Sequence, residues 1–119
     1  MKTFILMSSV NPQTASPVSV VTTMRDCATT ARSWVDRARK LVPEAEFVAH
    51  FALLGSYDFM DIYHAPDEET AAKVAWICCA DGTFKVESWT AIPESRMQEL
   101  ASQLAEGIQQ QAQSETEQI

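Results

Sequence analysis

Residues 54–69 read LGSYDFMDIYHAPDEE and contain a turn, a strand and the start of a helix. Gly55-Ser56 separates two apolar runs, which is typical of a short connection between antiparallel strands. The run FMDIY is apolar on consecutive positions except at Asp61, so we expect a strand that is buried on both faces. Asp67, followed by two glutamates, predicts a capped helix N-terminus.

Apolar spacing on either side of this stretch predicts the remaining elements. A helix is expected to start with Ser16 as N-cap and Pro17 at its first position. Strands are predicted over 2–10, 45–54, 58–65 and 83–92, and helices over 18–41, 67–80 and 93–110. This βαββαβ order with a C-terminal helix is the ferredoxin-like α+β fold, with a four-stranded antiparallel sheet. Its central strands are the first and third, the two that are apolar on both faces here.

The predicted fold leaves one face of the sheet without cover. We expect residues 1–110 to form a single domain and residues 111–119 to form a polar, disordered tail. The two crossover helices cover one sheet face, and the other keeps apolar side chains. An uncovered apolar face indicates a partner. We therefore predict a homodimer with two sheets packed face to face, or a higher homo-oligomer.

The bulk composition argues against several classes of protein. The 119 residues are 46% hydrophobic and carry a net charge of −7, which disfavours generic binding to nucleic acid or to anionic membranes. No apolar run approaches the ~20 residues of a membrane-spanning helix, and the N-terminal run is too short for a signal peptide. Residues 25–40 are locally basic, which suits either a solvated helix face or an anion-binding face.

The cysteines give a prediction about the cellular compartment. An odd number of cysteines, Cys27, Cys78 and Cys79, indicates free thiols in a reducing environment, so we expect a cytoplasmic protein. Cys27 lies on the apolar stripe of the first helix and is expected in the core. The chain has no glycine-rich phosphate loop, Cys-x-x-Cys pair or serine-centred elbow. We predict neither a cofactor nor a metal site.

The stretch over residues 54–69 resembles the defining segment of the GYD domain family. That family's pattern is a glycine, one variable residue, Tyr-Asp, an apolar strand, and Ala-Pro-Asp before an acidic helix start; here these are Gly55, Tyr57-Asp58 and Ala65-Pro66-Asp67. The resemblance covers about residues 2–92, whereas the long first helix and the Gln-rich C-terminal extension depart from the pattern. It implies a dimeric α+β barrel and no particular reaction. Related barrels include cofactor-independent monooxygenases and small-molecule sensing domains, an analogy of fold alone.

Five polar residues are candidates for ligand binding: His50, Tyr57, Asp58, Asp61 and His64. Asp58 can bind turn amides and Tyr57 can pack over the hairpin, a structural role that follows from the glycine before them. The alternative is that both line the mouth of a cavity between sheet and helices. No residue is assigned a catalytic role.

The two histidines and Asp61 depend on the register between the second and third strands. If residue 50 lies opposite residue 62, His50 and His64 share a face as diagonal neighbours ~7–8 Å apart. They would then bind a ligand together or act as an acid–base pair, unless they are simply satisfied or exposed. A buried Asp61 needs a partner, either His50 or a basic residue of a partner subunit. On this register, however, Asp61 and Phe51 lie on the face opposite the histidines, and alternation places Phe47 with Phe51.

Three functions are compatible with these observations. The first is a homo-oligomeric domain of undetermined activity that binds a small organic ligand. The second is a cofactor-independent monooxygenase or isomerase that acts on a small apolar or aromatic substrate. The third is a regulatory interaction module that docks through the basic helix face.

Overall fold

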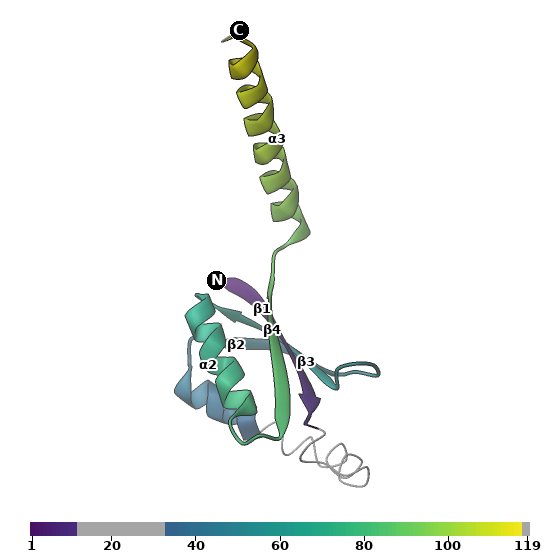
Figure 1. Ribbon diagram of the computed structural model, residues 1–119. Coiled ribbons are helices and arrows are strands. Elements are labelled where there is room, and N and C mark those ends of the chain that lie inside the picture. Colours follow the sequence, from purple (N-terminus) through teal and green to yellow (C-terminus); the bar gives the residue numbers. More distant parts are fainter. Residues whose placement is uncertain (12–32, 118–119) are drawn as a thin grey trace.

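The computed structural model describes residues 1–11 and 33–117 (Figure 1). Its strands are β1 (Lys2–Val10), β2 (Glu46–Ala52), β3 (Phe59–Ala65) and β4 (Phe84–Ala91). Its helices are a segment over 33–41, α2 (Glu68–Cys79) and α3 (Glu94–Glu117). The predicted helix start at Ser16-Pro17 and the predicted core position of Cys27 lie outside the described residues.

The four strands form one antiparallel sheet in the order β2-β3-β1-β4. β1 and β3 occupy the centre, as predicted from their apolar pattern. Residues along β3 alternate between buried and partly buried, so the expected full burial of both faces is not seen in the described chain. The strand order confirms the ferredoxin-like α+β fold. β2 and β4 form the two edges.

The hydrophobic core lies between the sheet and the helices. Phe4 and Leu6 of β1 and Tyr63 of β3 point to this side and are almost completely buried. Residues of the helix over 33–41, the residue that follows it and residues of α2 pack on the sheet and complete the core: Trp34, Ala38, Val42, Ala71, Val74 and Cys78. We call this side of the sheet the covered face.

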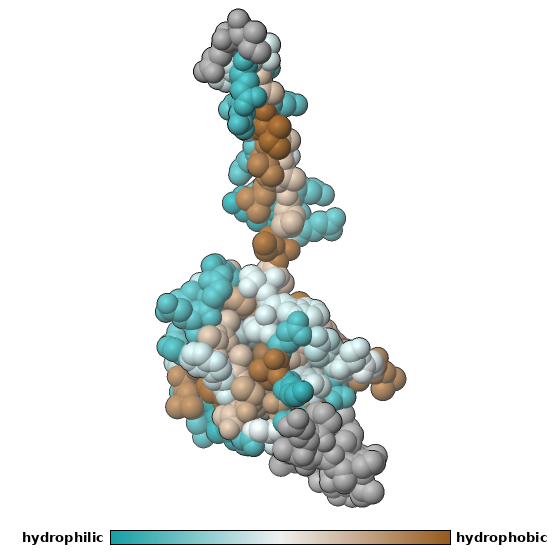
Figure 2. Space-filling view, viewed as in Figure 1, coloured by the Kyte–Doolittle hydropathy of each residue, from teal (hydrophilic) through white to brown (hydrophobic). Residues whose placement is uncertain are grey.

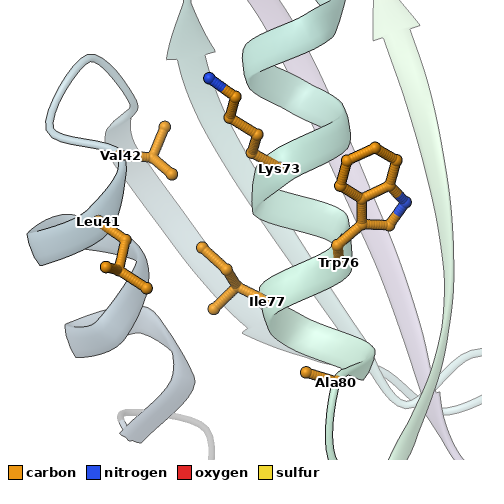
Figure 3. A pocket seen from close by; sticks show the side chains of 6 residues that line it. All are labelled: Leu41, Val42, Lys73, Trp76, Ile77 and Ala80. Atoms are coloured by element: carbon orange, nitrogen blue, oxygen red, sulfur yellow. The ribbon is translucent and has the colours of Figure 1, made fainter.

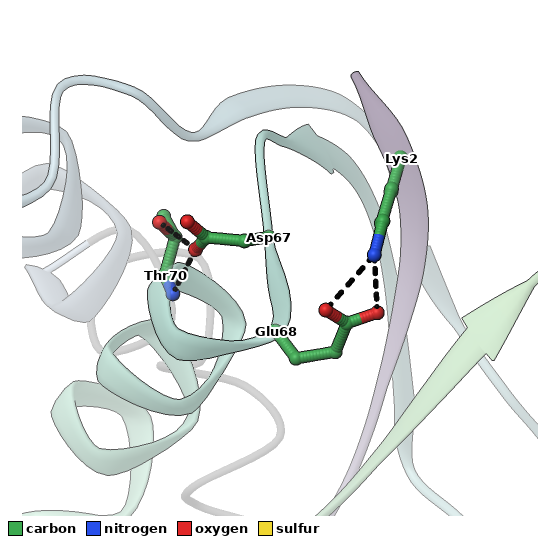
Figure 4. Close-up of polar contacts among 4 residues, drawn as sticks. All are labelled: Lys2, Asp67, Glu68 and Thr70. Carbon is green, nitrogen blue, oxygen red and sulfur yellow. Dashed lines mark hydrogen bonds and ion pairs between the residues drawn. The ribbon is translucent and has the colours of Figure 1, made fainter.

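Asp67 caps α2, as the sequence predicts. Its Oδ1 accepts hydrogen bonds from the Thr70 amide at 2.8 Å and from the Thr70 hydroxyl at 2.7 Å (Figure 4). These hydrogen bonds hold the pKa of Asp67 below its ordinary value. Glu68 follows at the first helical position and binds Lys2 of β1 at 2.8 Å, which lowers the pKa of Glu68 and ties the helix start to the sheet.

The register between β2 and β3 differs by one residue from the register assumed for the sequence. Ala52 lies opposite Phe59, and His50 therefore lies opposite Asp61 rather than opposite residue 62. The connection over 53–58 causes this shift, because the Leu53 amide donates to the Asp58 carbonyl at 2.8 Å and closes the hairpin at that pair. Asp61 and His50 therefore share a face, which is the alternative that the assumed register had disfavoured.

A β-bulge at Val48 breaks the simple alternation along β2. Phe47 lies opposite Tyr63 and Ala49 lies opposite Ile62, so Val48 is an extra residue in the edge strand. As a result Phe47 and His50 both lie on the covered face, whereas strict alternation along the strand, as predicted from the sequence, would place them on opposite faces. Phe47 packs there against Tyr63, with ring centroids 5.5 Å apart.

The other side of the sheet, which we call the open face, carries a row of large apolar side chains. By the strand pairing these are Ile5, Met7, Phe51, Met60, Ile62 and Trp89. Phe51 is 50% exposed and Trp89 is 41% exposed. None of the described helices packs on this face, which agrees with the expectation of an apolar surface without cover.

α3 extends away from the sheet after Ile92 and Pro93 (Figure 1). The sequence predicted a helix that ends near residue 110, but α3 continues to Glu117. The polar run after residue 110 consists mainly of Gln, Ala and Glu, which have good helix propensity, so the helix continues where we expected fraying.

Candidate functional site

The candidate site is the pair formed by His50 on β2 and Asp61 on β3. The two residues are directly opposite in the ladder, and Nδ1 of His50 lies 2.6 Å from Oδ1 of Asp61. Both side chains point to the covered face, because Asp61 alternates with the core residues Phe59 and Tyr63. The sequence identified both residues as candidates, and the structure joins them.

The two members of the His50–Asp61 pair differ in burial. The Asp61 side chain is 2% exposed, whereas the His50 side chain is 44% exposed. The second carboxyl oxygen, Oδ2 of Asp61, has no hydrogen-bond partner within residues 1–11 and 33–117. A buried acceptor without a partner costs about 1–3 kcal/mol. Such a cost is a reason to look for a ligand or another functional role at Asp61.

The surroundings of the pair are mainly apolar. The His50 ring stacks on Phe59 with centroids 5.6 Å apart and an interplanar angle of 11°. Leu6 lies opposite Asp61 on the neighbouring strand. Burial raises the pKa of Asp61, and the hydrogen bond from His50 opposes this change. The pKa of the buried Cys78 thiol is also raised, first by desolvation and then by the charge of Asp61.

This geometry allows the exposed side of His50 to give or take a proton. When Asp61 is ionised, it can only accept, so Nδ1 of His50 donates and Nε2 is an acceptor. When Asp61 is protonated, its hydroxyl donates to Nδ1 and Nε2 of a neutral ring carries the proton. The buried carboxylate also fixes the orientation of the half-exposed ring, as a general base requires.

His64 is not part of this site. Its Nδ1 lies 3.2 Å from the Thr3 hydroxyl, and β3 alternation places it on the open face. The register on which the two histidines would share a face is therefore not the one that forms, and they lie on opposite faces. The physical reason is the one-residue register difference: His50 pairs with residue 61, and residues 61 and 64 point to opposite sides of a strand.

Asp58 has a structural role in the connection between β2 and β3. Its Oδ2 accepts from the Val10 amide at 2.8 Å, and its own amide donates to the Ser8 carbonyl at 2.9 Å. Asp58 thereby binds the end of β1 to the hairpin. Gly55 adopts a φ of +154°, a conformation that residues with a side chain rarely take. The predicted role of Asp58 in binding amides is confirmed, with the amide of a neighbouring strand as its partner.

Tyr57 lies over the open face rather than beside the His50–Asp61 pair. Its hydroxyl donates to Glu87 of β4, and its ring meets Trp89 edge to face with centroids 6.0 Å apart. The hydrogen bond to Glu87 raises the pKa of Tyr57 and lowers that of Glu87. Sequence reasoning missed both Glu87 and the stacking role of Phe59, because each contact joins segments whose proximity depends on strand order and register.

Comparison with known proteins identifies the family. The family model described as GYD domain matches residues 4–101, which is most of the chain. The chain belongs to the GYD domain family. No curated protein and no solved structure matches the chain. The resemblance seen at residues 54–69 is thus confirmed.

In this GYD domain the residues of the family segment serve the fold. Gly55 supplies the unusual backbone angle, Asp58 holds the end of β1, and Tyr57 bridges to β4. The His50–Asp61 pair lies on the covered face, whereas Tyr57 lies on the open face. The five predicted site residues therefore divide into one histidine–carboxyl pair on the covered face and three residues with other contacts.

A shallow groove lies on the outer side of the helices, between the segment over 33–41 and α2. It has a volume of about 320 Å³ and is lined by Leu41, Val42, Lys73, Trp76, Ile77 and Ala80 (Figure 3). This lining contains neither a histidine nor a carboxylate. The groove of the GYD domain is therefore separate from the His50–Asp61 pair.

The described residues contain no group of three or more His, Cys, Asp or Glu side chains placed to hold a metal ion. Cys78 is buried and Cys79 is partly buried, and both are free thiols. Among the described helices, none combines the length and apolar character needed to cross a membrane.

Proposed function

We propose that this GYD domain binds a small organic ligand at the His50–Asp61 pair. The observation that carries the proposal is the almost fully buried carboxyl of Asp61, which has one oxygen on His50 and one oxygen without a partner in the described part of the chain. A polar group that is costly for stability and joined to a half-exposed histidine is typical of a binding or catalytic site.

The chemistry of the pair suggests the class of ligand. Nε2 of His50 recognises a group that donates or accepts one hydrogen bond, such as a phenol, an enol or a carbonyl. Phe59 beside His50 offers an aromatic surface for the rest of the molecule. We therefore propose a small, largely apolar or aromatic molecule with one hydroxyl or carbonyl group.

The open face supports the second part of the proposal, that the protein is a homodimer. Its large apolar side chains are partly exposed in one chain, and a second copy offers the same surface. Packing two open faces together would bury this surface, and a stable dimer needs about 1,000 Å² or more. The free thiols of Cys78 and Cys79 are in keeping with a reducing compartment, so we propose the cytoplasm.

A second candidate function is proton-transfer catalysis at the same pair. The hydrogen bond from Nδ1 to a buried carboxylate favours it, because this arrangement orients an imidazole whose Nε2 can remove a proton from a substrate. Isomerases and cofactor-independent oxygenases both begin by removing a proton from an acidic carbon or a phenol. Ligand binding is common to both candidates and is therefore tested first.

Ligand-observed NMR with a panel of phenols and hydroxy-aromatic acids tests the binding site. We expect compounds that bind the wild type to lose at least tenfold in affinity to His50→Ala and to keep their affinity for His64→Ala. The second variant is the matched control, because it removes the other histidine of the chain from the open face. Equal loss of binding in both variants, or in neither, would contradict the assignment.

Native mass spectrometry of protein purified from its own cells tests assembly and ligand retention together. We expect the mass of a dimer, with additional mass from a retained small molecule. The Phe51→Asp variant should be monomeric, because a charge buried between two packed open faces has no partner. A monomeric wild type would contradict the dimer, and a wild type that binds no member of the panel and retains no added mass would contradict the ligand site.

A further inference from the structure

α3 carries an apolar stripe that contacts nothing in the described chain. The stripe consists of Met97, Leu100, Leu104 and Ile108, whose exposures range from 39% to 66%. Figure 2 shows a line of hydrophobic surface along the projecting helix. All residues from 94 to 116 are exposed. A lone helix of this kind has little stability from propensity alone, so it gains stability mainly by packing its apolar side.

The width of the stripe indicates what covers it. At about 100° per residue, its four side chains fall within about 80° of the helix circumference. A helix that lies on a sheet or a core has an apolar side of at least about 100°, whereas a narrow seam is typical of two paired helices. Small or uncharged residues border the stripe: Ala101, Gln103, Ala105, Gly107 and Gln111. The pattern therefore suits one further helix better than a sheet face.

The charges on α3 narrow the choice of partner. The helix carries Arg96 against Glu94, Glu99, Glu106, Glu115 and Glu117, so it is acidic. Glu115 falls in line with the stripe but lies about two turns beyond Ile108, where the stripe ends. An acidic helix is unsuited to anionic membranes or nucleic acid. Helical spacing places Glu99 and Glu106 on the side opposite the stripe. Two copies of α3 can therefore bring their stripes together without placing these like charges face to face.

From these observations we propose that α3 pairs with α3 of a second copy of this chain along the stripe. The two stripes are identical, so the contact is self-complementary, as a two-fold dimer requires. The seam spans only about three helical turns, which is short for an independent coiled coil. It acts together with the globular part of the chain, whose own contacts raise the effective concentration of the two helices. This pairing is an interface distinct from the open face and stands on separate observations.

Sedimentation equilibrium of the full chain tests whether the stripe drives association. We expect Leu100→Glu with Leu104→Glu to raise the dissociation constant at least tenfold. The matched control is Ser102→Glu with Gln109→Glu, which adds the same charge on the side of the helix opposite the stripe and should associate like the wild type. Unchanged association of the stripe variant, with its sheet domain still folded by circular dichroism, would overturn the proposal. The pairing rests on the proposed open-face contact for its effective concentration, so Phe51→Asp should weaken association as well. Association that is lost in Phe51→Asp but unchanged in the stripe variant would overturn the helix pairing and leave the open-face dimer standing.

Disulfide trapping identifies the surface that α3 meets. In a chain with Cys27→Ser, Cys78→Ala and Cys79→Ser, we introduce Leu104→Cys and mix it with the same variant or with Leu100→Cys. Paired helices should give a covalent dimer with the first mixture if they are parallel and with the second if they are antiparallel. A third mixture combines Leu104→Cys with Phe51→Cys, which lies on the open face. If only this mixture gives a covalent dimer, or if neither of the first two does, α3 covers another surface and the proposal is overturned.

Discussion

The two faces of the sheet each carry one histidine, and the two histidines have different environments. His50 on the covered face is bound to a carboxyl that is 2% exposed. His64 on the open face is bound to the hydroxyl of Thr3, at the end of the sheet where β1 begins. The difference teaches that the partner and its burial, rather than the residue type, distinguish the two histidines.

The same contrast holds for whole faces. On the covered face, helices exclude water, and burial is the largest cause that raises the pKa of Asp61 and of Tyr63. On the open face, polar contacts such as Tyr57 with Glu87 lie at the surface. The covered face contains the hydrophobic core and the candidate site. The open face offers apolar area to a partner.

The largest expected effect comes from matched phenylalanines on the two faces. Phe4→Ala should lower the free energy of unfolding by about 3–5 kcal/mol, because it leaves a cavity in the core. Phe51→Ala on the open face should cost less than about 1 kcal/mol at protein concentrations where the chain is monomeric. Urea denaturation measures both values. Equal losses would break the distinction between a core face and an interface.

A smaller effect of opposite sign is expected at Asp61. Asp61→Leu should raise the free energy of unfolding at pH 7 by about 1–3 kcal/mol, because it removes a buried acceptor without a partner. The same variant should lose ligand binding. A residue that costs stability and supports function is what the candidate site predicts.

The pH dependence of this effect follows from the direction of the pKa change. Because burial raises the pKa of Asp61 above 3.8, the native state binds the proton more readily than the unfolded chain. The stability contributed by Asp61 is therefore fully present below about pH 4 and is lost as the pH rises through the raised pKa. The advantage of Asp61→Leu should shrink between pH 7 and pH 4 in urea denaturation. Leu41→Ala, at an exposed site without a titratable group, is the control and should show no such trend.

The connection that carries Tyr57 onto the open face should depend on Gly55. Gly55→Ala should cost about 1–2 kcal/mol, because a φ of +154° strains any residue with a side chain although no neighbour lies within 4 Å. Gly107→Ala adds the same methyl group to α3, also with free space around it, and should not destabilise the protein. Thermal unfolding compares the two. Equal melting temperatures for the two variants would show that the connection is not strained.

The smallest expected effect is a change of titration on the open face. Glu87→Gln should lower the pKa of Tyr57 toward its ordinary value of 10.0, because the hydrogen bond to the carboxylate raises it. Phenolate absorbance reports the change, and Tyr63, whose pKa is raised by burial, serves as the internal reference. A Tyr57 titration that does not respond would mean that Tyr57 does not bind Glu87 in solution.

Much of the fold could be predicted from local signals. Consecutive apolar residues placed β1 and β3 in the centre of the sheet, and Asp67 with two following glutamates marked the start of α2. These signals depend on nearest neighbours along the chain. The extension of α3 to Glu117 was missed because the polar run was interpreted as frayed, although its residues favour a helix.

The candidate site could be predicted only in part. His50 and Asp61 were selected from their residue types and their position in strands. Their pairing could not be predicted, because a register change of one residue moves every side chain of a strand to the other face of the sheet. That register depends on how Leu53 and Asp58 close the hairpin, a contact that composition and periodicity do not encode. The homodimer, the ligand and the cytoplasmic location stay predictions.

The bulge at Val48 also makes the two edges of the sheet unequal. An edge strand with a regular row of free amides and carbonyls is a template on which another chain can add a strand, and a bulge interrupts that row. β2 has such an interruption, whereas β4 pairs regularly with β1 from Phe84 to Thr90. Addition of further strands to this sheet, as in fibre formation, should therefore begin at β4. Lys85 and Glu87 are the charged side chains on β4 that oppose such pairing.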